Sequence, residues 1–206
     1  MPAIIGRKLG MTQIFGEDGA RVPLTVIEAG PCPVTQVKTA DADGYDAVQL
    51  GFGAAKPKSL NGPKLGHLKA AGAPPVRHLH EFSREELGAE VAVGDVVTVD
   101  PFEPGQMVRV TGISKGKGYA GTIKRHNFSA GPKSHGSHNI RQPGSIGAAA
   151  YPARVFKGTR MSGRLGGRQV TQRGLQVVDR DPMRNLLLVR GAVPGGVNGI
   201  VIVRPE

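Results

Sequence analysis

The stretch Gly10-Met-Thr-Gln-Ile-Phe-Gly-Glu-Asp-Gly-Ala-Arg-Val-Pro-Leu-Thr-Val-Ile-Glu-Ala29 places two β-rich runs on either side of a turn. Gly16-Glu-Asp-Gly19 is typical of a tight turn, because glycine and aspartate tolerate the backbone conformations that such turns require. The flanking runs, residues 10–15 and 22–29, contain the β-branched and aromatic residues that favour strands. This stretch therefore predicts two strands joined by a short turn.

Short β-rich runs separated by turn residues continue along the rest of the chain. The further predicted strands are residues 3–5, 34–39, 46–53, 96–99, 107–112, 121–124, 170–178, 185–190 and 199–203. Residues 63–71 predict one short helix, and Ser83-Arg-Glu-Glu86 has the capping-box spacing that opens a single helical turn. Many short strands with few helices predict a mainly β chain, arranged as a barrel or a sandwich.

The composition narrows the class of protein. The chain has 206 residues, a net charge of +11 and a pI near 10.2, which fits one ordinary domain or two small ones. With one cysteine, Cys32, it can form no internal disulfide and no cysteine cluster for zinc. No run approaches the roughly 18 apolar residues of a membrane helix, and residues 1–15 hold no apolar core of signal-peptide length. We therefore expect a soluble cytosolic protein with a polyanionic partner and no metal or cofactor.

The positive charge is concentrated in the second half of the chain. Residues 1–103 carry 10 basic and 13 acidic groups, whereas residues 104–206 carry 17 basic and 3 acidic groups. Residues 104–178 contain 13 Lys or Arg and no carboxylate. Solvated surfaces normally mix both signs, so this segment indicates contact with phosphates, whose neutralisation releases counterions. Glycine and proline disfavour the amphipathic helix that a membrane contact needs, and no recognition helix for duplex DNA is visible. RNA is the predicted partner, with an acidic protein partner or a role in solubility alone as the alternatives.

Residues 125–160 break the strand pattern. They include Asn127-Phe-Ser-Ala-Gly-Pro-Lys-Ser-His-Gly-Ser-His-Asn-Ile-Arg-Gln-Pro-Gly144, which has no periodicity and few apolar groups. Loops longer than about 12–15 residues without structure of their own are usually functional or disordered. We predict an extended loop at 125–160 that is ordered by its partner, with a disordered linker as the alternative. Residues 1–124 and 161–206 together are predicted to form the globular body, with a loop and short-helix insertion at about 54–90.

Two motifs are similar to chemical sites but lack the surroundings that such sites need. Gly116-Lys-Gly-Tyr-Ala-Gly121 matches the pattern G-x-G-x-x-G. A dinucleotide site also requires a helix and an acidic residue about 20 positions further on, yet the next carboxylate is Asp179. His135 and His138 have H-x-x-H spacing without a nearby Cys, Asp or Glu to complete a metal shell, which favours a backbone or phosphate contact.

No catalytic constellation emerges from the remaining titratable residues. His78 and His80 are interpreted as a structural pair on one face of a strand, because neighbours two apart share a face. The acidic residues of this region are interpreted as a solvated face: Glu81, Glu85, Glu86 and Glu90. The sequence therefore predicts that the chain is not an enzyme, and a nucleotide-dependent enzyme remains an alternative that rests only on residues 116–121.

The candidate RNA-binding residues are the cations of the carboxylate-free segment, polar residues of the predicted loop and a basic pair near the N-terminus. They are Arg7, Lys8, Lys115, Lys117, Lys124, Arg125, His126, Asn127, Lys133, His135, His138, Arg141, Gln142, Arg154, Lys157, Arg160, Arg164 and Arg168. The glycines of residues 116–121 permit close approach of the backbone to a sugar–phosphate chain. The aromatic residues Tyr119, Phe128, Tyr151 and Phe156 are interleaved with the cations, where they can stack on unpaired bases.

Five blocks occur in order along the chain: Ile4-Ile-Gly-Arg-Lys-Leu-Gly-Met-Thr-Gln-Ile-Phe15, Thr111-Gly-Ile-Ser-Lys-Gly-Lys-Gly-Tyr-Ala-Gly-Thr-Ile-Lys-Arg-His-Asn-Phe128, Pro143-Gly-Ser-Ile-Gly147, Val155-Phe-Lys-Gly158 and Asn185-Leu-Leu-Leu-Val-Arg-Gly-Ala-Val-Pro-Gly195. Together they resemble the bacterial large-subunit ribosomal protein L-three family. The blocks extend from the first residues to the last predicted strand, so the resemblance covers nearly the whole chain.

This resemblance implies a β-barrel body of the kind shared with translation factors, and a loop that threads through ribosomal RNA toward the peptidyl transferase centre. It also implies binding to large-subunit (23S-type) rRNA near its 3′ end, a role in early assembly, and contact with the ribosomal proteins L-fourteen and L-nineteen. Some relatives carry a methylated glutamine after the Gly-Ser-Ile-Gly block. This sequence has Ala148, Ala149 and Ala150 there, so no such modification is expected.

The resulting hypothesis is a structural constituent of the large ribosomal subunit in the cytoplasm, without catalytic activity. A free RNA-binding regulator or chaperone that uses the same basic surface is the alternative.

Overall fold

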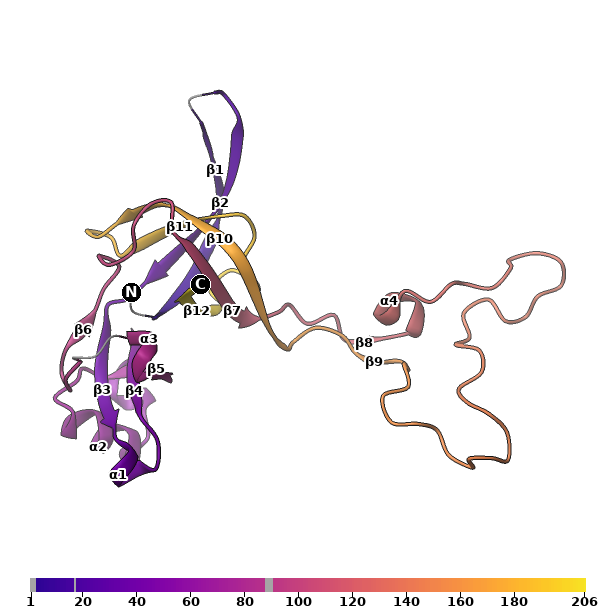
Figure 1. The fold of residues 1–206 in the computed structure, drawn as a ribbon, viewed down its shortest axis with the longest axis horizontal. Helices are drawn as coiled ribbons and strands as arrows, with labels where there is room; N and C mark the ends of the chain where they lie inside the picture. The colour runs from indigo at the N-terminus through magenta and orange to yellow at the C-terminus, as the bar shows by residue number, and fades with distance from the viewer. Residues whose placement is uncertain (1–2, 17, 88–90) are drawn as a thin grey trace. The chain divides into compact units, whose positions relative to one another are not determined.

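Strands dominate the described part of the chain (Figure 1). The structure is a computed structural model that describes residues 3–16, 18–87 and 91–206. Its strands are β1 (Ile4–Phe15), β2 (Arg21–Ala29), β3 (Cys32–Lys38), β4 (Ala47–Ala54), β5 (Val76–Ser83), β6 (Val96–Val97), β7 (Met107–Ile113), β8 (Tyr119–Ala120), β9 (Gly163–Arg164), β10 (Gln169–Asp181), β11 (Leu186–Arg190) and β12 (Ile200–Pro205). The prediction of a mainly β fold is confirmed.

The helical segments are short. They are α1 (Ala40–Asp43), the 3-10 turn η1 (Pro57–Ser59), α2 (Gly62–Ala70), α3 (Arg84–Leu87) and α4 (Thr122–His126). None of these helices, which are those of the described residues, has the length and apolar character needed to cross a lipid bilayer.

Six antiparallel strands close into a barrel in the order β1-β12-β7-β10-β11-β2. The predicted strands at residues 3–5 and 10–15 are parts of one strand, β1, which pairs with β12 near its start and with β2 from Gly6 onward. Val201 and Val203 of β12 are buried, whereas Ile202 between them is only half-buried. Because successive side chains on a strand face opposite sides, one set lines the interior, where apolar burial stabilises the barrel.

A second sheet of four strands, in the order β5-β4-β3-β6, shares a hydrophobic core with the barrel. This core includes Ile5 from β1 and Leu50 and Phe82 from the second sheet. The sequence predicts only a loop and a short helix at residues 54–90, but this region also contains β5, which pairs with β4. The placement of His78 and His80 on a strand is confirmed, since both belong to β5.

Two helical predictions are confirmed and one strand prediction is wrong. Helix α2 begins after Asn61, whose side chain accepts a hydrogen bond from the backbone, and α3 begins directly after Ser83. Residues 121–124, predicted as a strand, belong to helix α4. This helix ends at Asn127, which adopts a left-handed conformation (φ 59°), and its last turn carries three basic residues that favour the negative end of the helix dipole.

The predicted turn joins β1 to β2. The backbone N–H of Gly19 donates to the carbonyl oxygen of Gly16 over 2.9 Å, and that of Gly16 donates to Ala20 over 2.9 Å. Glu17 of this turn lies outside the described residues, as does Glu90 of the predicted acidic face.

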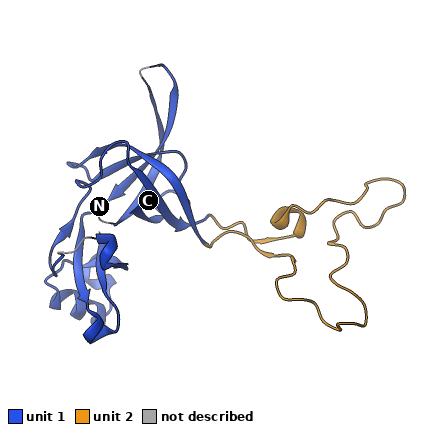
Figure 2. Ribbon diagram, in the orientation of Figure 1, with its two compact units in different colours: residues 1–114, 169–206 blue, residues 115–168 orange. Residues whose placement is uncertain are grey.

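The chain divides into two compact units (Figure 2). The barrel unit contains residues 1–114 and 169–206 and carries the barrel and the second sheet. The basic unit contains residues 115–168. The predicted loop, residues 125–160, lies within the basic unit, which continues beyond the loop at both ends.

Candidate nucleic-acid interface

The basic unit begins and ends in a narrow ladder of backbone hydrogen bonds. β8 pairs antiparallel with β9, and beside this pair Lys117 N donates to Leu165 O and Leu165 N donates to Gly118 O, each over 2.9 Å. At Gly166 the two segments approach so closely that a Cβ atom would collide with the carbonyl oxygen of Lys115, and the φ angle there is +71°. Only glycine fits this position. The ladder therefore fixes where the intervening segment leaves and returns.

Helix α4 binds the outgoing segment to the returning one. Arg125 Nη1 donates to the carbonyl oxygen of Met161 over 2.6 Å, and His126 Nε2 lies 3.1 Å from the same oxygen. The hydroxyl oxygens of Tyr119 and Ser162 are 2.7 Å apart. Arg125 and His126 are predicted RNA-binding residues, but this structure uses part of their hydrogen-bonding capacity to hold Met161 in place.

The backbone between α4 and β9 forms neither helix nor strand. A backbone hydrogen bond of 3.0 Å from Gly131 N to Ile140 O closes a smaller loop within it. Of the whole basic unit, all of whose residues are described, Ala120 and Thr122 are the buried ones. The segment therefore has almost no apolar core of its own.

Three of the four aromatic side chains in the basic unit are exposed: Tyr119 (79%), Tyr151 (90%) and Phe156 (59%). Phe128 is half-buried, and its ring centroid lies 6.1 Å from that of His126. Exposed aromatic rings are costly to leave in water and are available to stack on unpaired bases.

The basic unit carries eleven Lys or Arg side chains and no carboxylate. All of these cations are exposed except Arg125, which is half-buried. Like charges repel one another, and no group within the unit neutralises them. A partner that supplies anionic groups would therefore relieve the repulsion among these cations.

Sixteen of the eighteen predicted site residues lie in this unit. Lys115 and Lys117 precede β8; Lys124, Arg125 and His126 belong to α4, with Asn127 at its end; Lys133, His135, His138, Arg141, Gln142, Arg154, Lys157 and Arg160 belong to the irregular segment; Arg164 belongs to β9, and Arg168 ends the unit.

The other two predicted residues, Arg7 and Lys8, lie in β1 of the barrel unit. Arg7 is exposed and forms an ion pair of 2.6 Å with Glu28. Lys8 is buried, and its Nζ donates to the carbonyl oxygen of Val193 over 2.9 Å. A buried ammonium bound to the backbone is not available to a phosphate, so its position argues against Lys8 as an RNA contact. Strand alternation is the signal that separates these neighbours, because adjacent residues face opposite sides.

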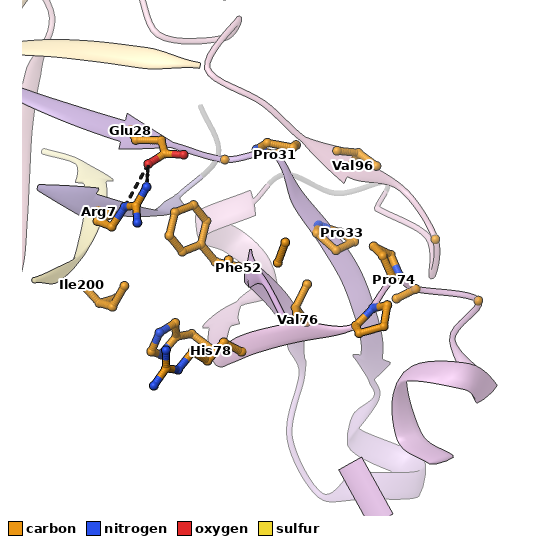
Figure 3. Close-up of a pocket in the computed structure, with 18 of the residues that line it drawn as sticks. Arg7, Glu28, Pro31, Pro33, Phe52, Pro74, Val76, His78, Val96 and Ile200 are labelled. Carbon is orange, nitrogen blue, oxygen red and sulfur yellow. Dashed lines mark hydrogen bonds and ion pairs between the residues drawn. The ribbon is translucent and has the colours of Figure 1, made fainter. Parts of the chain in front are cut away.

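A groove of about 900 Å³ lies on the barrel unit beside Arg7 (Figure 3). Phe52 and Val76 give it an apolar lining, together with several prolines. Its titratable lining residues are Arg7, Glu28, Arg77 and His78. Partial burial lowers the pKa of His78, and nearby cations add to this effect. The groove therefore offers apolar surface and cations, with its one carboxylate already paired, rather than a nucleophile and a general base.

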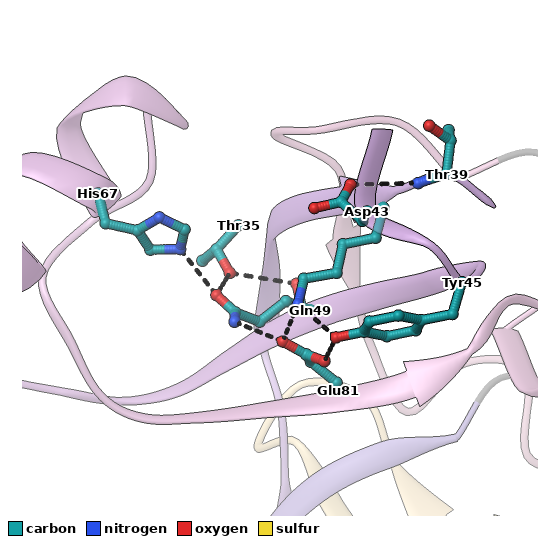
Figure 4. A network of polar contacts seen from close by, with 8 residues as sticks. Thr35, Thr39, Asp43, Tyr45, Gln49, His67 and Glu81 are labelled. Atoms are coloured by element: carbon teal, nitrogen blue, oxygen red, sulfur yellow. Dashed lines mark hydrogen bonds and ion pairs between the residues drawn. The ribbon is translucent and has the colours of Figure 1, made fainter. Parts of the chain in front are cut away.

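A network of polar side chains crosses the second sheet (Figure 4). Gln49 donates to Glu81 Oε1 over 3.2 Å, and the amide oxygen of Gln49 lies 2.8 Å from Nε2 of His67. Glu81 also accepts from Tyr45 (2.8 Å) and pairs with Lys38 (2.9 Å). These hydrogen bonds, that of Lys38 first, hold the pKa of Glu81 below its ordinary value. These polar groups satisfy one another's hydrogen-bonding capacity, which is typical of a network that stabilises the fold.

Two residues of the predicted solvated acidic face, Glu81 and Glu86, are half-buried in the structure. Glu81 is half-buried within the network, and Glu86 is half-buried between Arg109 and Arg204, at 3.1 and 3.0 Å. Within the described ranges, no three His, Cys, Asp or Glu side chains come together in a way that could hold a metal ion.

Several known proteins are similar to this chain over nearly its whole length. A family model for "Ribosomal protein L3" matches residues 76–184. The large ribosomal subunit protein uL3 of Acidothermus cellulolyticus is 57% identical over 202 residues, which are 98% of this chain and 90% of the relative. The uL3 proteins of Nostoc punctiforme and Thermosynechococcus vestitus are 54% and 53% identical over 98% of this chain, covering 96% and 95% of their own lengths. The chain belongs to the ribosomal protein L3 family.

In this L3 family member, the glycine pattern of residues 116–121 leads into a helix, α4, which the sequence does not predict. That helix has five residues, and the strand before it, β8, pairs antiparallel with β9. A dinucleotide site requires a strand of a parallel sheet followed by a long helix, so this geometry does not support one. Membership of a ribosomal protein family favours a structural component over an enzyme.

Proposed function

We propose that this L3 family member is a structural constituent of the large ribosomal subunit, in the cytoplasm, and that its basic unit binds large-subunit rRNA. The observation that carries this proposal is the charge of the basic unit: eleven cations, ten of them exposed, and no carboxylate. The names of the relatives, which are large ribosomal subunit proteins, support the choice of partner.

The physical basis is neutralisation of phosphate. Each Lys or Arg that contacts a phosphate releases condensed counterions, which supplies affinity without reading the base sequence. An irregular backbone can follow the path between RNA helices, since it has no internal hydrogen-bonding pattern to preserve. The β8–β9 ladder and the Arg125–Met161 contact hold the two ends of the segment together. Tyr151 and Phe156 are exposed and supply surfaces on which unpaired bases stack.

The finer parts of the proposal follow from the family resemblance. They are binding near the 3′ end of the rRNA, a role in early assembly, organisation of RNA near the peptidyl transferase centre, and contact with the neighbours L-fourteen and L-nineteen. In this proposal peptide-bond formation stays with the RNA, because the basic unit holds no carboxylate to pair with a general base.

The proposal is tested by neutralising five cations of the basic unit and comparing the result with neutralisation of five cations of the barrel unit. The test variant replaces five exposed cations of the basic unit by glutamine: Lys133, Arg141, Arg154, Lys157 and Arg160. The matched control replaces five exposed cations of the barrel unit: Lys56, Lys58, Lys69, Arg173 and Arg190. Both variants lose the same net charge, so only the place of the charge differs.

Binding of both purified variants to large-subunit rRNA is then measured across a salt series. If the five basic-unit cations contact phosphates, the slope of log K against log salt falls by about 3–4, and the affinity near 100 mM salt falls at least about tenfold. The control variant keeps most of the wild-type slope. An equal loss in both variants would contradict the assignment to the basic unit.

A free RNA-binding regulator remains the second candidate, because an exposed basic surface binds RNA without an assembled particle. Sedimentation of a cell lysate through a sucrose gradient, after a high-salt wash, separates the two. A structural constituent stays with the large subunit in a one-to-one ratio. A regulator washes off or remains at the top of the gradient.

A further inference from the structure

The β1–β2 hairpin continues beyond the barrel as a ribbon of two strands, here called the β1–β2 ribbon and comprising residues 9–15 and 21–23 (Figure 1). β12 pairs with β1 only up to Arg7, and β11 pairs with β2 only from Leu24 onward. Past these points the two strands pair with each other alone, up to Phe15 and Arg21. Isolated two-stranded ribbons are marginally stable in water, so this one gains stability from a surface that covers it.

The ribbon carries large apolar side chains that the barrel does not bury. Phe15 is 69% exposed, Met11 54%, Ile14 38% and Leu9 36%. Met11, Gln13 and Phe15 alternate along β1 and so share one face of the ribbon. Single exposed apolar residues are common, but several on one projecting element indicate an interaction surface.

The outer edge of this ribbon on β1 lacks the charged residues and prolines that commonly protect free strand edges. Residues 9–15 contain no charged residue and no proline. Natural edge strands are usually blunted by lysine, proline or a covering element, because their unpaired backbone groups recruit further strands. The partner strand β2 does carry Pro23 and Arg21 in this part. The open β1 edge is therefore the side on which an added strand fits.

The charges of the ribbon and its turn favour a different partner from that of the basic unit. Residues 9–23 hold the carboxylates Glu17 and Asp18 and one cation, Arg21. With two carboxylates against one cation, this stretch offers a polyanion little attraction, whereas the carboxylates of the turn attract a basic protein. A protein that binds the same RNA beside this chain also needs cations of its own to neutralise phosphates.

We propose that the β1–β2 ribbon binds a positively charged protein, which adds a strand to the open edge of residues 10–15 and covers Met11 and Phe15. Main-chain hydrogen bonds would hold the added strand, and the apolar face would give the contact its specificity. This inference deepens the proposed function, because it assigns a protein contact to one edge of the barrel unit and names how the partner binds there. It rests on the proposed function in one respect, namely that the partner is found in the large ribosomal subunit.

The first test is photo-crosslinking in assembled large subunits. A photoreactive phenylalanine analogue, p-benzoylphenylalanine, replaces Phe15 in the full chain, and the crosslinked product is identified by mass spectrometry. We expect a crosslink to one protein of net positive charge, within a segment that forms an edge strand. A crosslink to rRNA, or no crosslink from this position, would overturn the proposal.

The second test uses the sign of an added charge. Met11→Lys combined with Phe15→Lys removes the apolar contact and repels a basic protein, but it strengthens any contact with RNA. We expect the amount of the crosslinked neighbour that stays on salt-washed subunits to fall at least fivefold. The thermal unfolding temperature of the purified variant should stay as in the wild type. The matched control is Met183→Lys, at a 93% exposed residue of the barrel unit, which should leave the neighbour in place.

Retention of the neighbour together with tighter rRNA binding in the double variant would place RNA on the ribbon and overturn the proposal. Equal loss of the neighbour in the Met183→Lys control would do the same. Failure of the proposed function has a different signature, because it appears as an unchanged salt slope when the basic unit is neutralised.

Discussion

In the barrel unit, Ile5, Leu24 and Phe102 are completely buried or nearly so, whereas in the basic unit Ala120 and Thr122 are the buried residues. The cations of the two units differ in the same way. In the barrel unit, arginines pair with Glu28 and Glu86, but the basic unit has no carboxylate to offer its eleven cations. The barrel unit thus contains the groups that stabilise it, and the basic unit depends on an anionic partner for its charge balance.

This difference teaches that exposure has opposite meanings in the two units. An exposed cation in the basic unit is available to a phosphate. An exposed apolar side chain on the β1–β2 ribbon offers nothing to a phosphate, but a protein can cover it. The two segments thus differ in the kind of partner that their composition favours.

The largest expected effect comes from removing the irregular segment. Deletion of residues 127–153, with a short Gly-Ser linker in their place, leaves the core of the barrel unit intact. We expect large subunits to stop maturing in cells that depend on this variant, while thermal unfolding of the purified chain changes little. Sucrose-gradient profiles and calorimetry measure the two effects.

A control for this deletion replaces the same residues by a Gly-Ser segment of equal length. It should fail like the deletion, because the side chains rather than the length of the segment meet the RNA. Normal subunits from either variant would contradict the function assigned to the segment.

A matched pair of phenylalanine substitutions separates stability from binding. Phe102→Ala removes a completely buried ring and should lower the free energy of unfolding by about 3–5 kcal/mol. Phe156→Ala removes a ring that is 59% exposed and should change it by less than about 0.5 kcal/mol. Phe156→Ala should instead weaken rRNA binding by about 1–3 kcal/mol, because stacking on a base is lost. Chemical denaturation and RNA titration of both variants measure these values, and a large loss of stability in Phe156→Ala would contradict the comparison.

Thiol reactivity provides a third comparison. Cys32 is buried and donates to the carbonyl oxygen of Ile5, and burial raises its pKa to about 12. Because the thiolate is the reactive form, we expect Cys32 in the folded chain to react with a thiol reagent at pH 8 roughly a thousandfold more slowly than in denaturant. A cysteine introduced at the exposed Ser129 of the basic unit should react at the rate of a free thiol. Rapid labelling of Cys32 in the native chain would show that this part of the core opens.

The smallest expected effect is a dependence of stability on pH. Partial burial, assisted by the charge of Arg204, lowers the pKa of His80 below its ordinary value of 6.5. The unfolded chain therefore binds a proton more readily, and stability is lost as the pH falls below 6.5 toward the folded pKa. Melting temperatures between pH 7.5 and 5.5 should fall less in His80→Phe than in the wild type, by a few degrees at most. His138→Phe, in the basic unit, should retain the wild-type dependence.

Most of the basic unit could be predicted from the sequence, because its main features are local. The absence of carboxylates, the cations and the lack of periodicity in residues 125–160 are all properties of the order of residues along the chain. The helix α4 was missed, since Thr122 and Ile123 favour strands and the left-handed residue that ends the helix, Asn127, gives only a weak signal.

In the barrel unit, tertiary contacts decide features that residue type alone does not predict. Arg7 and Lys8 look alike in sequence, yet Arg7 is exposed and Lys8 is buried against backbone carbonyls from a loop near residue 193. Likewise, the exposed face of Met11 and Phe15 looks like the core of a strand until the pairing of β12 is known to end at Arg7.

The order of residues alone is enough to show that the chain is mainly β, that its charge is divided between two regions, and that it belongs to the L3 family. These depend on residue type and short-range spacing, which pairing between distant strands does not alter. Only the tertiary structure decided the barrel order β1-β12-β7-β10-β11-β2, the burial of Lys8 and the free edge of the β1–β2 ribbon. Those depend on which distant strands pair, and that choice is made by the shared burial of apolar surface across the whole barrel unit.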